Sequence, residues 1–277
     1  MYALFWGVQC ASQCWRSSSR RNESDRIART IKSVREWVDE VIVIDSGSTD
    51  ETVALAKDAG ARVIGRAWQG FGRQKRFGEL QCRNDWVLNL DADEVVTPAL
   101  REEIALLFKS GLPKLNAYGM PVPMIYPNCT RPRWLARDHW CVRLYNRRVV
   151  RFRDCPLHDS VVTTGHAVGK LNAPLWHYSV RSFPDLVSKL DARTWLAVSE
   201  RRPKSAAELW LRLVTELPVN FLKYYLGRRH FTGGLTGSVY ASVYSWYRYL
   251  RVVRMWQAIR SGSETRLSSP GGHAFRL

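Results

Sequence analysis

Three short apolar segments in the N-terminal half constrain the fold of this chain more than any other feature. Each is too short for a helix and is typical of a strand buried in a parallel sheet. Segments with helical periodicity or helix-start signals come before, between and after them. Such alternation predicts βαβ units. The expected strands are Val41–Asp45, Arg62–Ile64 and Trp86–Leu90, and the expected helices are Glu23–Val38, Ser48 to about Gly60, and one opening at Thr97–Pro98.

Acidic residues follow two of the three expected strands. Asp45 ends the first strand, and Asp91 and Asp93 come directly after the third. Ligands of open α/β sheets bind beyond the carboxyl ends of the strands, so both clusters are placed for binding. Two carboxylates separated by one residue can hold a divalent cation that also binds a diphosphate. Acidic turns are common on surfaces, but a buried strand in front of this Asp-x-Asp motif favours the functional interpretation.

The segment Asp45–Asp50 reads as a turn with two compatible roles. The carboxylate of Asp45 could accept a hydrogen bond from a nucleoside base or a ribose hydroxyl. Ser48 and Glu51 have the spacing of a capping box, which predicts that a helix begins here.

Other polar candidates have open interpretations. Arg73, Lys75 and Arg76, between the acidic clusters, could reach diphosphate oxygens or could form a solvated basic helix face. Asp159 is either a general base near an acceptor or a surface acid. His177 is either a metal ligand or a hydrogen-bonded structural histidine, and the structural role is the more common one.

The net charge of the chain limits the classes of partner that it is expected to bind. Lys and Arg number 42 against 25 Asp and Glu, a formal net charge of +17 that attracts nucleic acid, anionic lipid or phosphorylated substrates. No recognised nucleic-acid motif is present, so we expect no nucleic-acid partner. The six cysteines include no CxxC pair, which argues against zinc and fits a reducing compartment. We expect no signal peptide and no simple spanning helix, because no apolar run is long enough.

The second half of the chain changes character twice. From about 115 to 180, short apolar and aromatic runs predict a mixed or antiparallel extension carrying the acceptor side. From about 183 onward the pattern is helical, and Arg248, Arg251 and Arg254 form a basic stripe. Such a helix either lies on an anionic bilayer or packs on the domain with a solvated basic face, and the sequence leaves both open.

Four segments together resemble family 2 glycosyltransferases, most closely the lipopolysaccharide core β-glucosyltransferase subgroup. They are Val41–Thr52, Trp86–Glu94, Pro156–Ser160 and Leu175–Ser179. The resemblance implies an α/β fold: a GT-A-like, Rossmann-type mixed sheet flanked by helices, with a C-terminal helical, basic and aromatic extension. The expected boundaries are an atypical segment 1–21, a nucleotide-sugar and acceptor domain 22–180, a membrane-associating helical extension 181–260 and a disordered tail 261–277.

The resemblance also implies roles for individual residues. Asp45 would contact the nucleoside, Asp93 would bind Mg²⁺ or Mn²⁺ with Asp91 nearby, and Asp159 would be the catalytic base. The family usually has Glu where Asp159 stands. With the candidates above, the expected nucleotide-sugar-binding residues are Glu23, Asp45, Ser46, Asp50, Arg73, Lys75 and Asp91, and the expected metal ligands are Asp91, Asp93 and His177.

The implied activity is a single displacement with inversion at the anomeric carbon. The donor would be a UDP-sugar carrying a hexose, by the subgroup glucose, and the acceptor a lipid-linked envelope glycan such as lipopolysaccharide core. We therefore expect a cytoplasmic enzyme, peripheral at the inner face of the cytoplasmic membrane and attracted to its anionic surface. The alternatives are a catalytically impaired, membrane-associated nucleotide-binding protein and a nucleic-acid-binding protein.

The N-terminal segment departs from the family pattern. The family begins with an apolar strand leading into a Thr-x-Asn-Glu turn, whereas Asn22–Glu23 here follow the polar run Trp15–Arg21. One hypothesis is that residues 1–21 derive from an altered reading frame or a wrong start. The alternative is that Leu4–Val8 supplies the strand. If the strand were missing, the nucleoside pocket would lose a wall.

Overall fold

The computed structural model describes residues 7–11, 23–136, 139–155, 160–199 and 205–260. The chain divides into two compact units. The first comprises Met1–Pro132 and Asp138–Ser179, and the second comprises Arg133–Arg137 and Val180–Leu277. Each unit is described by itself.

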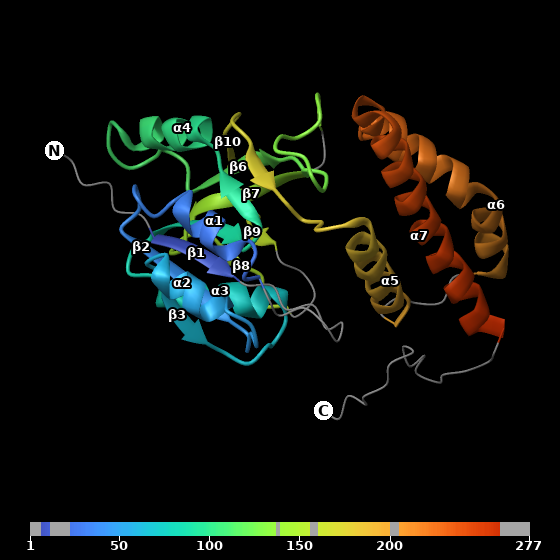
Figure 1. The fold of residues 1–277 in the computed structure, drawn as a ribbon, viewed down its shortest axis with the longest axis horizontal. Coiled ribbons are helices and arrows are strands. Elements are labelled where there is room, and N and C mark those ends of the chain that lie inside the picture. Colours follow the sequence, from blue (N-terminus) through green and yellow to red (C-terminus); the bar gives the residue numbers. More distant parts are fainter. Residues whose placement is uncertain (1–6, 12–22, 137–138, 156–159, 200–204, 261–277) are drawn as a thin grey trace. The chain divides into compact units, whose positions relative to one another are not determined.

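The first unit is built on a seven-stranded mixed sheet with the order β10-β6-β7-β4-β1-β2-β3 (Figure 1). Strands β4, β1, β2 and β3 are parallel neighbours, whereas β7 runs antiparallel to both β4 and β6. The strands are β1 Gly7–Ala11, β2 Glu40–Asp45, β3 Arg62–Gly65, β4 Trp86–Asp91, β6 Ala117–Val122, β7 His139–Asn146 and β10 Gly169–Lys170. The predicted parallel sheet is therefore confirmed, and of the mixed or antiparallel extension expected after it the structure shows the mixed form, since β10 pairs in parallel with β6.

Both faces of this sheet are covered. On β2, Val41 and Val43 face one apolar core, and Ile42 and Ile44 face the other, because side chains alternate along a strand. The first core includes α1 Ile27–Lys32, α2 Thr52–Asp58 and α4 Pro98–Phe108, and the second is bordered by α3 Phe71–Gln81. Two small ribbons complete the unit: β5 Glu94–Val96 with β11 Leu175–His177, and β8 Arg151–Phe152 with β9 Val161–Val162.

Two of the three predicted helix starts need correction. The helix expected over Glu23–Val38 is limited to α1, after which the chain turns. The capping box is wrong: the hydroxyl of Ser48 donates to Asp45 Oδ1 at 2.5 Å, so Ser48 belongs to the strand-end turn and α2 begins later. The third start is confirmed, since Thr97 Oγ1 accepts from the backbone N–H of Leu100 at 3.1 Å.

A strand does occupy the centre of the sheet. β1 pairs in parallel with both β2 and β4, and Ala11 lies opposite Ile44 on one side and Asp91 on the other. This strand includes Gly7 and Val8 of the Leu4–Val8 alternative, so the condition under which the nucleoside pocket would lose a wall is not met. The origin of residues 1–21 stays a hypothesis.

The second unit is helical. It contains α5 Phe183–Ser199, α6 Ala206–Leu222, a π turn Lys223–Gly227, a 3₁₀ turn His230–Gly233 and α7 Gly234–Arg260. α6 and α7 lie side by side, and α5 packs on α7 (Figure 1). Gly237 permits a close approach, because a Cβ there would lie 1.8 Å from the carbonyl oxygen of His230. Among the described helices, none is both long and apolar enough to cross a membrane.

The basic stripe of α7 turns into this unit. Arg251 is buried, and Arg254 Nη2 lies 2.6 Å from Asp191 Oδ1 of α5. Arg248 Nε lies 3.4 Å from Glu216 Oε1 of α6. The expectation that the stripe faces a bilayer or solvent is therefore wrong, because acids of neighbouring helices pair with it.

Candidate active site

Two acidic strand ends share one edge of the first unit. Asp45 ends β2 and Asp91 ends β4, and β1 separates these strands. Because all three strands are parallel, their carboxyl ends lie at the same edge. The predicted donor-binding residues around Asp45 and the Asp-x-Asp motif thus belong to one region of the molecule.

The turn after β2 is bonded to its own aspartate. Asp45 Oδ2 accepts from the backbone N–H of Gly47 at 2.8 Å and of Ser48 at 3.0 Å. Gly47 has φ +92°, a left-handed conformation that favours glycine. Gln74 of α3 donates to Ser46 Oγ at 3.1 Å, which ties this turn to α3. The nucleoside roles of Asp45 and Ser46 stay predictions.

Asp50 and Glu23 join two loops at the same edge. Asp50 Oδ1 accepts from the backbone N–H of Thr52 at 3.0 Å, and Asp50 Oδ2 accepts from that of Ser24 at 3.3 Å. The backbone N–H of Glu23 donates to Thr52 Oγ1 at 2.8 Å. Burial raises the pKa of Asp50, but these hydrogen bonds from Thr52 and Ser24 outweigh it and leave the pKa lowered. Both residues thus have structural contacts, and their donor-binding roles stay predictions.

Asp91 lies in a buried ion-pair cluster. Its Oδ1 is 2.8 Å from Lys75 Nζ, and its Oδ2 is 3.0 Å from Arg143 Nη2. Arg143 also pairs with Glu94, whose Oε2 accepts from the backbone N–H of Asp91 at 2.9 Å. We call Lys75, Asp91, Glu94 and Arg143 the strand-tip cluster. Its two acids and two cations pair with each other, as buried charges require.

The cluster sets the charge of Asp91. Burial alone would raise the pKa of Asp91, but Lys75 and Arg143 bring it down to about 2. Lys75 is only 1% exposed, and its ammonium group pairs with the Asp91 carboxylate within the fold. Burial raises the pKa of Glu94, with Arg143 opposing the shift. Sequence reasoning missed Glu94 and Arg143, although a charged residue inside the apolar run Cys141–Tyr145 was a usable signal.

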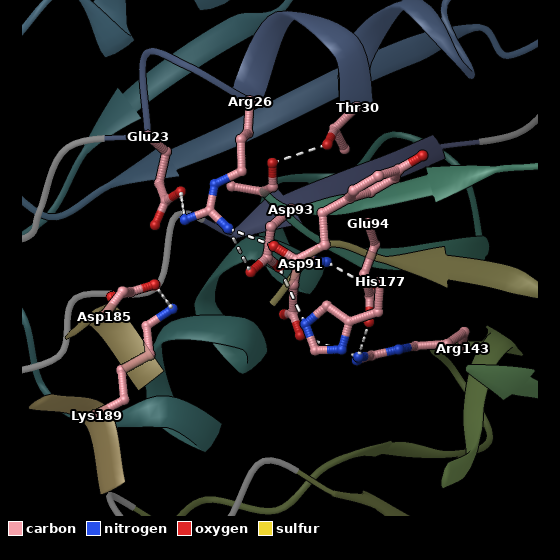
Figure 2. Close-up of polar contacts among 12 residues, drawn as sticks. Glu23, Arg26, Thr30, Asp91, Asp93, Glu94, Arg143, His177, Asp185 and Lys189 are labelled. Atoms are coloured by element: carbon pink, nitrogen blue, oxygen red, sulfur yellow. Dashed lines mark hydrogen bonds and ion pairs between the residues drawn. The ribbon is translucent and has the colours of Figure 1, made fainter. Parts of the chain in front are cut away.

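Asp93 lies beside this cluster, between a cation and an imidazole (Figure 2). Arg26 Nη1 is 3.3 Å from Asp93 Oδ2, and His177 Nε2 is 3.3 Å from Asp93 Oδ1. Arg26 also donates a hydrogen bond to the backbone carbonyl oxygen of Tyr178. The backbone N–H of Tyr178 in turn donates to the backbone carbonyl oxygen of Asp93 at 2.9 Å. Burial lowers the pKa of His177, but the Asp93 carboxylate outweighs it, so the pKa is raised. The His177–Asp93 contact thus joins β11 to the Asp-x-Asp turn.

The donors of this region suit a divalent cation with substrate ligands. Among the described residues, no group of three or more His, Cys, Asp or Glu side chains could hold a metal ion alone. Both oxygens of Asp91 lie within 3.0 Å of a cation, whereas the oxygens of Asp93 make longer contacts of 3.3 Å, to Arg26 and to His177. The 3.3 Å separation of Asp93 and His177 is close to the spacing of about 3 Å between adjacent ligands of octahedral Mg²⁺. Such ions often take one or two protein ligands and fill the remainder with water and phosphate oxygens.

The remaining predicted residues lie apart or outside the described chain. Arg73 is exposed, and its Nε lies 3.2 Å from Asp154 Oδ1. Arg76 donates to the carbonyl oxygen of Phe152 at 2.9 Å, linking α3 to β8. Asp159, the predicted base, lies outside the described residues.

Comparison with known proteins agrees with this architecture. A family model described as "Glycosyl transferase family 2" matches residues 21–164, and the chain belongs to this family. It is 37% identical over 248 residues to an uncharacterized glycosyltransferase of Rickettsia felis, covering 86% of this chain and 88% of the relative. It is 26% identical over 252 residues to the lipopolysaccharide core biosynthesis glycosyltransferase LpsC of Rhizobium meliloti, covering 85% of this chain and 89% of that one.

Solved structures resemble the chain more distantly. Glucosyl-3-phosphoglycerate synthase from Mycobacterium tuberculosis, in complex with Mn²⁺ and UDP-glucose, aligns with a TM-score of 0.44 and 17% identity, covering 69% of this chain and 76% of that one. The expected class of enzyme, a glycosyltransferase, is confirmed by the family and its relatives. The expected α/β class, a mixed sheet flanked by helices with a C-terminal helical region, is confirmed by the fold.

Proposed function

We propose that the protein is an inverting glycosyltransferase that transfers a hexose, glucose by its subgroup, from a UDP-sugar to a lipid-linked envelope glycan such as lipopolysaccharide core. The reaction takes place at the inner face of the cytoplasmic membrane. The observation that carries the donor part is the Asp93–His177 pair on the same sheet edge as Asp45. The lipopolysaccharide part is supported by the similarity to LpsC over most of both chains.

Each residue has a defined task in this proposal. Asp45 binds the nucleoside, with Ser46 and Asp50 shaping its turn. Asp93 and His177 hold Mg²⁺ or Mn²⁺, which when bound neutralises charge on the diphosphate leaving group. Asp91 stays ionised and fixed between Lys75 and Arg143, which orients the Asp-x-Asp turn.

The transfer is a single displacement. An acceptor hydroxyl attacks the anomeric carbon, the bond from that carbon to the diphosphate breaks, and the configuration inverts. Asp159 accepts the proton of the hydroxyl as general base. The membrane role is supported by the excess of basic residues, which an anionic surface attracts.

A donor screen by nucleotide release tests this function. Purified protein is incubated with UDP-glucose and other nucleotide sugars, with lipopolysaccharide core acceptor and with Mg²⁺, Mn²⁺ or EDTA. We expect metal-dependent UDP release, reduced at least about a hundredfold in Asp93→Asn. Asp58→Asn is the matched control, because Asp58 is an exposed aspartate at the end of α2. Full transfer in EDTA would contradict the metal assignment, and UDP binding without any turnover would favour a catalytically impaired protein.

A further inference from the structure

The helix α6 buries Leu209 in the ordinary way, but it also buries polar residues and exposes large apolar ones, unlike a helix on the surface of a water-soluble domain. Trp210 is 69% exposed and Val214 is 61% exposed, whereas Glu216 and Asn220 are buried. A water-facing helix normally directs its polar residues outward and its apolar residues inward. Among the described residues, α6 exposes six large apolar side chains, of which Val219 is one; the other five form what we call the outer face of α6: Trp210, Leu211, Val214, Leu217 and Leu222.

The polar residues of α6 are accommodated inside the unit. Glu216 pairs with Arg212 at 2.8 Å, with Arg248 at 3.4 Å and with Arg251 at 3.9 Å. Asn220 donates to the carbonyl oxygen of Glu216 at 2.7 Å. We call Glu216, Arg212, Arg248 and Arg251 the Glu216 cluster. Because these charges are paired against α7, the outer face of α6 presents almost only apolar side chains.

The apolar surface continues around the turn between α6 and α7. Leu226, Phe231 and Leu235 are exposed there. Arg133 donates to the carbonyl oxygen of Arg228 at 2.9 Å, which brings the segment of the exposed Trp134 to the same end of the unit. Tryptophan and leucine beside basic residues are the composition of helices that lie at a membrane interface.

We propose that the outer face of α6 lies on the surface of an anionic lipid bilayer and docks the enzyme there. Between Val180 and Leu277 the sequence has 16 Lys and Arg against 6 Asp and Glu. This charge is attracted to anionic lipid and repelled by a second copy of the same unit. The face is docked rather than inserted across the bilayer, since no described helix is long and apolar enough to span it.

The proposal rests on the proposed function in its choice of partner, because a lipid-linked acceptor is found at a bilayer surface. In this proposal the outer face of α6, and not the basic stripe of α7, contacts the bilayer. Burial of apolar side chains supplies the attachment, and the net charge of the unit strengthens it on anionic lipid.

Vesicle co-sedimentation of the full chain tests the docking face. The vesicles are phosphatidylcholine alone and phosphatidylcholine mixed with phosphatidylglycerol. We expect binding to the mixed vesicles, weakened at least about tenfold in the double variant Val214→Glu/Leu217→Glu. The matched control is Leu106→Glu/Leu112→Glu, which makes the same chemical and charge change at exposed leucines of the first unit. It should bind like the wild type.

Two measurements on the same preparations separate the outcomes. Thermal unfolding checks that both double variants are folded, as expected for exposed positions. UDP binding with Mn²⁺ should be unchanged in both double variants. If the wild-type protein bound vesicles but not UDP, the result would contradict the proposed function and still support the docking face. Unchanged vesicle binding by Val214→Glu/Leu217→Glu would overturn the proposal. A wild-type dimer that this variant converts to a monomer, with vesicle binding retained, would assign the face to a second copy instead.

Discussion

Both units bury a cluster of paired charges, and the clusters differ in balance and in what they leave at the surface. The strand-tip cluster has two acids and two cations, and it lies beside Asp93 and His177. The Glu216 cluster has one acid and three arginines, and it lies behind an apolar helix face.

The difference separates two uses of a buried ion pair. In the first unit, Arg143 bridges Asp91 and Glu94 and so fixes the turn that carries Asp93. In the second unit, Glu216 gathers arginines inward, which removes charge from the side of α6 that faces away from α7. The desolvation of a buried ion pair can cost more than the pair returns, but removing one partner leaves an uncompensated buried charge, so each cluster can be tested by removing one of its charges.

The largest effect should come from breaking the strand-tip cluster. Arg143→Met leaves Asp91 and Glu94 buried with one bonded cation fewer, so we expect unfolding free energy to fall by about 3–5 kcal/mol. Urea denaturation measures it. The control is Arg148→Met, because Arg148 is exposed and pairs with Asp85 at the surface, where the loss should stay below about 1 kcal/mol. Equal losses in the two variants would show that the cluster is not a distinct stabilising unit.

A smaller effect is expected in the second unit. Glu216→Gln removes the one acid of its cluster and leaves Arg212, Arg248 and Arg251 facing each other. We expect the unfolding free energy to fall by about 2–3 kcal/mol. This is less than for Arg143→Met, because Arg248 is partly exposed and water can screen its charge. Glu208→Gln, at an exposed position in the first turn of α6, is the control and should lose under about 1 kcal/mol. Chemical denaturation of the full chain gives both values, and a loss above that of Arg143→Met would reverse the ranking.

Close packing in the second unit gives the third prediction. Gly237→Ala adds a Cβ that would clash with the carbonyl oxygen of His230, so α7 must shift. We expect the unfolding free energy to fall by about 1–3 kcal/mol. Gly227→Ala is the control, since no atom lies within 4 Å of the added Cβ and the backbone there has no positive φ. Thermal melting compares the two. A Gly237→Ala protein that melts like the wild type would show that the helices near this turn can separate freely.

The sheet could be predicted from sequence because its signals are local. The runs Val41–Ile44 and Trp86–Leu90 are apolar except for Asn89, and both lie in buried strands of the fold. The Asp-x-Asp turn was found for the same reason, because it directly follows one of them. The helix Glu23–Val38 was too long because its periodic apolar residues also pack in the turns after α1, where Val34 and Val38 are buried.

The charged contacts could not be predicted, because they join residues far apart in the chain. Arg26 reaches Asp93 across 67 positions, and Arg143 reaches Asp91 across 52. For Lys75 the sequence left a diphosphate contact and a solvated helix face open; the fold buries it against Asp91, which rules out the solvated face, and the diphosphate role stays a prediction. The basic stripe of α7 failed in the same way, since a repeat of Arg residues gives their helical face but not the acid opposite it.

The smallest and most diagnostic effect on stability should come from Glu79, a buried acid for which no ion-pair partner is found among the described residues. Glu79 Oε1 accepts from Tyr145 Oη at 2.7 Å and from the backbone N–H of Phe152 at 3.0 Å, and burial raises its pKa above the ordinary 4.5. Asp91, paired with Lys75 and Arg143, shifts the opposite way.

The sign of the pH dependence follows from that raised pKa. The folded protein binds the Glu79 proton more tightly than the unfolded chain, so this contribution to stability is complete at acid pH and is lost as pH rises through the folded pKa. Glu79→Gln keeps the accepting oxygen and does not titrate. The unfolding free energy of the wild type minus that of this variant should therefore fall as the pH rises above the ordinary glutamate pKa of 4.5 and through the raised pKa of the folded protein. Denaturant titrations across this range measure it, and a difference that rises with pH would mean that the Glu79 carboxylate is stabilised in its charged form, as Asp91 is.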